Sequence, residues 1–92
     1  MALDQALQEV VDILRRAFPA GVPQDDYLPM LVVLSEGLAE ENLGIVVEEF
    51  TGIDRYLVIH EAVEAMTTKR PAAADTERVG RALTDAGWSS DD

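Results

Sequence analysis

The amino-acid sequence predicts an all-α fold, a compact bundle of four to five short helices that pack orthogonally. Apolar residues recur three or four positions apart in several segments, which is the spacing of one helix face. Proline and glycine separate these segments, so the helices are too short for a coiled-coil bundle. A chain of 92 residues fits one domain, and we expect a single helical domain over residues 1–88 with a frayed acidic tail over residues 89–92.

The first helix is expected over residues 3–17, where mainly polar residues fall between the apolar ones. It should stop at Phe18, because a residue that precedes a proline avoids the helical region. Two prolines and a glycine then make residues 19–23 a rigid turn. We interpret this turn as a corner between helices, and a binding loop is the alternative.

The second helix is expected to be capped by Asp25 or Asp26, with Pro29 in its first turn. Apolar side chains lie nearly all round residues 27–34, which is typical of a buried central helix. A buried strand is the alternative, because this segment contains two adjacent β-branched valines.

A third helix is expected over residues 39–50, after a stop at Gly37. Glu40 and Glu41 fall in its first turn, where the helix dipole favours negative charge. Gly44 is expected to weaken this helix by about 1 kcal/mol relative to alanine. The predicted inner face consists of Leu43, Val46, Val47 and Phe50.

The fourth helix is expected to run to about Thr67, with Thr51 as its cap and Asp54 completing a capping box. Its predicted inner stripe consists of Tyr56, Ile59, Val63 and Met66. Three apolar residues in a row, Leu57 to Ile59, cannot all face one core. A structural homodimer, in which one of these residues faces a second subunit, is therefore an alternative to the single-chain interpretation.

The fifth helix is expected to be capped by Asp75 or Thr76. Gly87 should end it, and Trp88 should fold back on its last turn. Its predicted inward residues are Val79, Leu83 and Ala86.

Two groups of residues carry a resemblance to a known family. The first is the segment 16–23 together with Asp26. The second consists of Pro71, Glu77, Arg78, Val79, Arg81, Leu83, Gly87 and Trp88. Over about residues 10–88 the chain resembles a small actinobacterial, largely mycobacterial, family catalogued as domain of unknown function 3349. The middle of the chain matches less well, since Ala39 stands where a capping serine is expected. The resemblance implies a compact helical domain from an actinobacterial cytoplasm, and it implies no activity or functional residue.

The charge of the chain is strongly negative. Eighteen acids and seven bases give −11, which disfavours nucleic acid and anionic membranes and favours a basic protein partner. No Lys or Arg occurs between Arg16 and Arg55, whereas eight acids do. We therefore predict a non-enzymatic protein-interaction module that uses an acidic face. The candidate partner-binding residues are Glu40, Glu41, Glu48 and Glu49.

The sequence offers little catalytic chemistry. The absence of cysteine excludes thiolate nucleophiles and cysteine-based metal sites. His60 begins a pattern like that of a zinc-protease helix, but Glu64 stands where the second histidine is required, which favours a surface His–Glu pair. Tyr27 stands where an acyl carrier protein has its modified serine. We therefore predict no catalytic residue, no metal and no cofactor; a small ligand-binding or enzymatic domain that uses carboxylates and His60 in a cleft is the alternative.

The location predicted from the sequence is cytoplasmic. The longest apolar run, residues 30–34, is far shorter than the roughly 20 residues of a membrane span. The first residues include acids and lack the basic-then-apolar pattern of a signal peptide.

Overall fold

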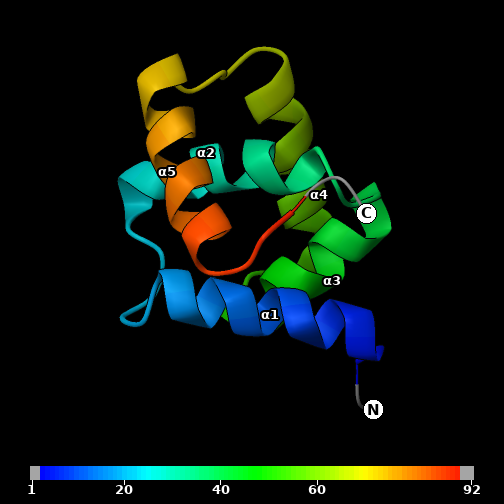
Figure 1. Ribbon diagram of the computed structural model, residues 1–92. Helices are drawn as coiled ribbons and strands as arrows, with labels where there is room; N and C mark the ends of the chain where they lie inside the picture. The colour runs from blue at the N-terminus through cyan, green and yellow to red at the C-terminus, as the bar shows by residue number, and fades with distance from the viewer. Residues whose placement is uncertain (1–2, 90–92) are drawn as a thin grey trace.

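The computed structural model describes residues 3–89, and over this range it contains five α-helices and no strand (Figure 1). This confirms the predicted all-α bundle of short helices. Helix α1 lies across the ends of α3 and α5, while α2 packs against α3, α4 and α5 (Figure 1). The helices are α1 (Gln5–Ala17), α2 (Gln24–Ser35), α3 (Glu40–Thr51), α4 (Arg55–Met66) and α5 (Ala73–Asp85). Residues 90–92 of the predicted tail lie outside the described range.

A single hydrophobic core joins the five helices, and α2 lies at its centre. Met30, Leu31 and Leu34 of α2 are fully buried, which confirms the predicted central helix and excludes the strand alternative. The other helices contribute smaller apolar faces to the same cluster. Its other members are Val11, Leu14, Phe18, Val33, Leu43, Val46, Val47, Val58, Ala62, Val79, Leu83 and Trp88.

The predicted start of α2 is wrong in detail. The helix begins at Gln24, directly after an extended Pro23 that supplies no side-chain cap. Asp25 and Asp26 therefore lie inside the first turn, where the dipole still favours their charge. Pro29 consequently lies in the second turn. Pro23 sets the boundary, because Val22 precedes a proline and therefore avoids the helical region, so the helix cannot begin before Pro23.

The predicted capping box of α4 is also wrong. Thr51 is the last residue of α3, and its hydroxyl donates to the Val47 carbonyl at 2.7 Å. Gly52 follows in the left-handed conformation, with φ 82°, which ends α3. The cap of α4 is Asp54, whose carboxylate accepts from the backbone N–H groups of residues 56 and 57.

The inner side of α4 differs from the predicted stripe. Its buried residues are Val58, Ala62 and Ala65. Of the predicted stripe, Ile59 is half-buried, and the others are exposed: Tyr56 to 74%, Val63 to 46% and Met66 to 42%. The helix buries its alanines because small side chains allow close approach to its neighbours.

Helix α5 starts at Ala73 without a side-chain cap, so the predicted caps Asp75 and Thr76 lie within the helix. Its end confirms the prediction. Gly87 adopts φ 112°, and the Trp88 N–H donates to the Leu83 carbonyl at 2.9 Å, which folds the chain back. Val79 and Leu83 are buried as predicted, and Ala86 is half-buried.

Gly44 marks the closest approach of α3 to α4. A Cβ atom there would lie 3.0 Å from the Arg55 carbonyl oxygen and 3.1 Å from Ile59 Cδ1. Gly80 provides a matched control, since its Cβ would meet only Val33 Cγ2 at 3.7 Å.

We expect Gly44→Ala to destabilise the protein by about 1 kcal/mol, because crowding against backbone outweighs the gain in helix propensity. Gly80→Ala should instead stabilise it by up to about 1 kcal/mol. Urea denaturation followed by circular dichroism measures both. Equal stabilisation by the two alanines would show that α3 and α4 do not approach this closely.

Candidate functional site

The four candidate glutamates all lie on α3, but in different surroundings. Glu40 and Glu41 are exposed in the first turn, and Glu49 is exposed near the end of the helix. Glu48 is half-buried and is bound to the start of α4. The structure therefore leaves three of the four charges free to face solvent.

Glu48 joins α3 to α4. Its Oε1 accepts from Arg55 Nη2 at 2.8 Å and from Nε at 3.1 Å, and its Oε2 accepts from the Arg55 backbone N–H at 3.0 Å. The side-chain and backbone hydrogen bonds from Arg55 hold the pKa of Glu48 below its usual range. Reversal of the Glu48 charge would therefore disturb the helix junction as well as any partner surface.

The acidic side of α3 borders α4. Gly44 and Glu48 face α4, since Gly44 lies against Ile59 and Glu48 binds Arg55. Glu40 precedes Gly44 by four residues and Glu41 precedes it by three, which places both on the same side of the helix. Glu49 lies about 100° further round the helix.

An apolar row with three exposed members runs along α4, the helix against which α3 packs. The row, here named the α4 stripe, repeats at helical spacing over about three turns. It consists of Tyr56, Ile59, Val63 and Met66. Leu57, also exposed at 50%, projects from another side of α4. The periodicity of this row was visible in the sequence, but it did not show which of two apolar sides of α4 faces the core.

His60 lies on the surface of α4, with its side chain 70% exposed. Its Nε2 is 3.6 Å from Glu64 Oε1, which confirms the predicted surface pair. Glu64 also lies 3.6 Å from Lys69 Nζ. Within residues 3–89, no group of three or more acidic or histidine side chains is arranged to hold a metal ion.

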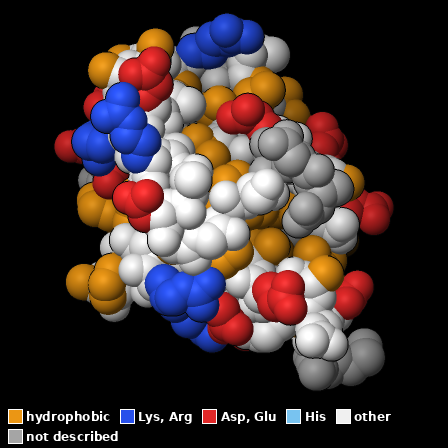
Figure 2. Space-filling view, viewed as in Figure 1, with side chains coloured by type: hydrophobic (Ala, Val, Ile, Leu, Met, Phe, Trp, Pro, Cys, Tyr) orange, Lys and Arg blue, Asp and Glu red, His pale blue; other side chains and the backbone are white. Residues whose placement is uncertain are grey.

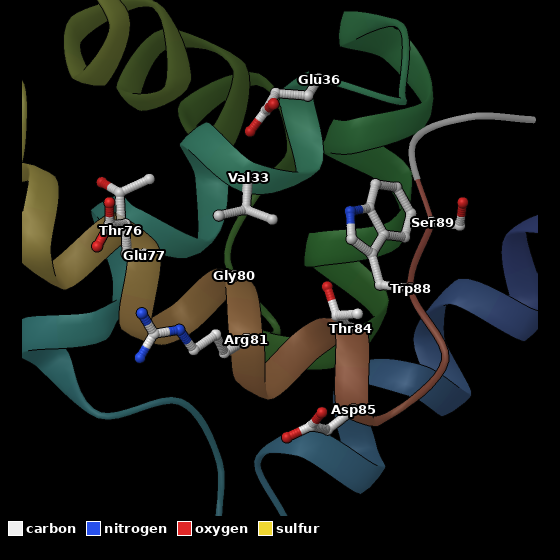
Figure 3. A pocket seen from close by; sticks show the side chains of 10 residues that line it. All are labelled: Val33, Glu36, Thr76, Glu77, Gly80, Arg81, Thr84, Asp85, Trp88 and Ser89. Atoms are coloured by element: carbon white, nitrogen blue, oxygen red, sulfur yellow. The ribbon is translucent and has the colours of Figure 1, made fainter.

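A groove between α2 and α5 has a polar rim around apolar residues (Figure 3). Val33 and Trp88 contribute its apolar part, and Gly80 leaves room above Val33. The carboxylates of Glu36 and Asp85 lie at opposite ends of the groove (Figure 3). These two acids are therefore not placed as a catalytic pair around one bond.

Tyr27 of α2 contacts α4 through its hydroxyl, which donates to Glu61 Oε1 at 2.9 Å. Burial, followed by the hydrogen bond and charge of Glu61, raises the pKa of Tyr27 above its ordinary value of 10.0. The raised pKa means that the unfolded chain releases this proton at a lower pH than the folded protein does. The corresponding stability is present below pH 10 and is lost as the pH rises further.

We therefore expect the free energy of unfolding to fall above about pH 10. Tyr27→Phe should lessen this alkaline loss, because it removes the titrating group. Urea titrations at neutral and alkaline pH measure the difference. An identical alkaline loss in the variant would show that Tyr27 does not contribute to it.

The basic side chains are mostly occupied by local contacts. Arg78 lies 3.3 Å from Asp75, three residues before it in the same helix, and Lys69 lies 3.6 Å from Glu64. On the face shown in Figure 2, Lys and Arg occur in separate groups with acids between them.

Among residues 3–89, no helix has the length and apolar character that a membrane crossing requires.

One long-range contact connects the two groups of residues that carry the family resemblance, and a second joins the first group to Ala86, the residue before Gly87. Arg78 Nη2 donates to buried Asp26 at 2.7 Å, and this links α5 to α2. Arg16 Nη2 donates to the Ala86 carbonyl at 2.8 Å, and this links the end of α1 to the end of α5. A family model described as a protein of unknown function, DUF3349, matches residues 5–92.

The chain belongs to the DUF3349 family. A search of curated proteins and a search of solved structures find no match to this DUF3349 protein. The contacts Asp26–Arg78 and Arg16–Ala86 give the resemblance a structural meaning, since they hold α1, α2 and α5 together. Gly21, with φ 92°, has open space around it, so the turn needs its backbone conformation rather than its small size.

Proposed function

We propose that this DUF3349 domain is a non-enzymatic protein-interaction module. Its binding surface consists of the α4 stripe together with the adjoining acids of α3. The observation that carries the proposal is the exposure of large apolar side chains on a helix that already buries another side. Exposed apolar side chains at helical spacing, bordered by charge, are typical of surfaces that bind another polypeptide.

The partner that fits this surface is a basic amphipathic helix of another protein. The α4 stripe extends over about 15 Å, which is the length of three helical turns. Glu40 and Glu41 are exposed on the side of α3 that carries Gly44, which faces α4, and would attract Lys or Arg on the partner. A second copy fits less well, because each chain carries −11 and the two would repel.

Two further parts of the proposal concern location and nucleic acid. We propose that the domain works in the cytoplasm, as its first residues predict, and that it does not bind nucleic acid, because the −11 charge would repel a phosphate backbone. The surface position of His60 favours a binding role for α4 over catalysis in a cleft.

The test uses a synthetic helical peptide of about 20 residues with Lys on one side and Leu on the other. We expect Glu40→Lys combined with Glu41→Lys to weaken binding at least about tenfold, because both attractive charges become repulsive. Fluorescence anisotropy of the labelled peptide measures the dissociation constant. Glu48 is left unchanged, because it holds Arg55.

A matched control carries Glu9→Lys and Glu77→Lys, which change the net charge equally from exposed positions on α1 and α5. Circular dichroism verifies that each variant is folded. Equal weakening by the two double variants would mean that the peptide senses only the net charge. Light scattering measures the molecular mass in solution. The mass of a dimer would mean that the α4 stripe serves self-association and not the binding of another protein.

A further inference from the structure

A second groove lies on another side of α4, where the turn before α2, the end of α3 and α4 converge. Its volume is about 660 Å³, within the usual range of small-ligand sites. Val22, Leu28, Phe50 and Ile53 supply apolar lining, and Tyr27 and Glu61 supply the polar groups that bond to each other. The groove thus combines an apolar wall with two carboxylates, Glu61, which Tyr27 orients, and Glu64, which is paired with Lys69.

Glu61 differs in its ion pairing from the other carboxylates of residues 3–89 that are at least half-buried. Each of the others lies between 2.7 and 3.8 Å from a Lys or Arg nitrogen. Glu61 has no ion pair within the described range, and its hydrogen bond comes from the neutral Tyr27 hydroxyl. These other carboxylates are Asp12, Asp26, Glu48, Glu64 and Asp75.

A neutral donor orients Glu61 without compensating its charge. The Tyr27 hydroxyl donates to Oε1 and is neutral at neutral pH, as a tyrosine with its ordinary pKa of 10.0 also is. A half-buried carboxylate that has no counterion is stabilised more by an added cation than a carboxylate fully exposed to water is, because water screens its charge less. Lys69 lines the same groove, but it is already 3.6 Å from Glu64.

We propose that this groove binds a small organic cation, a primary amine carried on an alkyl or aryl body. The ammonium group would pair with Glu61, and the apolar body would lie along Leu28, Phe50 and Ile53. This site is separate from the α4 stripe and does not depend on the proposed interaction function. The turn at residues 19–23 then acts as a binding element as well as a corner, since Val22 lines the groove.

The test is an NMR titration of the ¹⁵N-labelled protein with n-hexylamine at neutral pH, where the amine is charged. We expect saturable shifts at Leu28, Phe50 and Ile53. Glu61→Gln should weaken binding about tenfold, because it removes the charge that pairs with the ammonium. Uncharged n-hexanol should bind the wild-type protein about tenfold more weakly than hexylamine.

The control is Glu9→Gln, an exposed acid of α1 that lies outside this groove. Equal binding of hexylamine by Glu61→Gln and wild type would overturn the proposal, as would equal affinities for hexanol and hexylamine. Equal weakening by Glu9→Gln would mean that the amine is attracted diffusely to an acidic protein, and this too would overturn the proposal. Intermolecular NOEs from the amine methylenes to Phe50 test the site in the wild-type protein even if a variant fails to fold, and their absence would contradict the proposal.

Discussion

Val58→Asp is expected to unfold the protein, whereas Val63→Asp in the same helix should leave it folded. Val58 is fully buried, and an aspartate there would place an unpaired charge in the core. The cost is about 4 kcal/mol or more, a large part of the stability of a domain of this size. Thermal melts followed by circular dichroism should show a midpoint lowered by about 20 °C or complete loss of the transition.

Val63 is the matched position, because the residue type and the helix are the same and its side chain is 46% exposed. Its aspartate variant should change stability by no more than about 0.5 kcal/mol. The reverse order of effects would mean that α4 turns the predicted stripe of Tyr56, Ile59, Val63 and Met66 towards the core. It would also remove the surface on which the proposed function rests.

Trp88→Ala is expected to destabilise the protein by about 3 kcal/mol. Trp88 is 9% exposed and belongs to the core cluster, although it follows the last helix. Its removal leaves a large cavity where the chain folds back over α5. Urea denaturation followed by far-ultraviolet circular dichroism measures the loss, since the variant has no tryptophan fluorescence.

Tyr56→Ala is the control for Trp88, as another aromatic residue with its side chain 74% exposed. It should change stability by less than about 0.5 kcal/mol. A loss below 1 kcal/mol in Trp88→Ala would show that the segment after Gly87 does not complete the core.

Helix number, order and approximate bounds could be predicted from the sequence, because apolar spacing and proline or glycine breaks are local signals. The residues that cap the helices were harder to predict. At α2, Pro23 set the boundary instead of Asp25, and at α4 the left-handed Gly52 assigned Thr51 to the preceding helix. In both places a backbone preference outweighed the hydrogen bond that a side chain offered.

The orientation of α4 could not be predicted, since it carries two apolar sides with small residues on one and large residues on the other. The core buries Val58, Ala62 and Ala65, the side with the smaller residues, whereas the close approach of α3 at Gly44 is to Ile59 on the other side. The long-range pairs Tyr27–Glu61 and Arg78–Asp26 join residues 34 and 52 positions apart, and helical spacing gives no sign of them.

The most direct test of the interaction proposal is a map of amide shifts in the ¹⁵N-labelled protein during titration with the basic amphipathic peptide. The account predicts that the largest shifts fall on the α4 stripe and on Glu40 and Glu41, and that they saturate together. Shifts concentrated on α1 and α5, or spread evenly over the acidic surface, would contradict it.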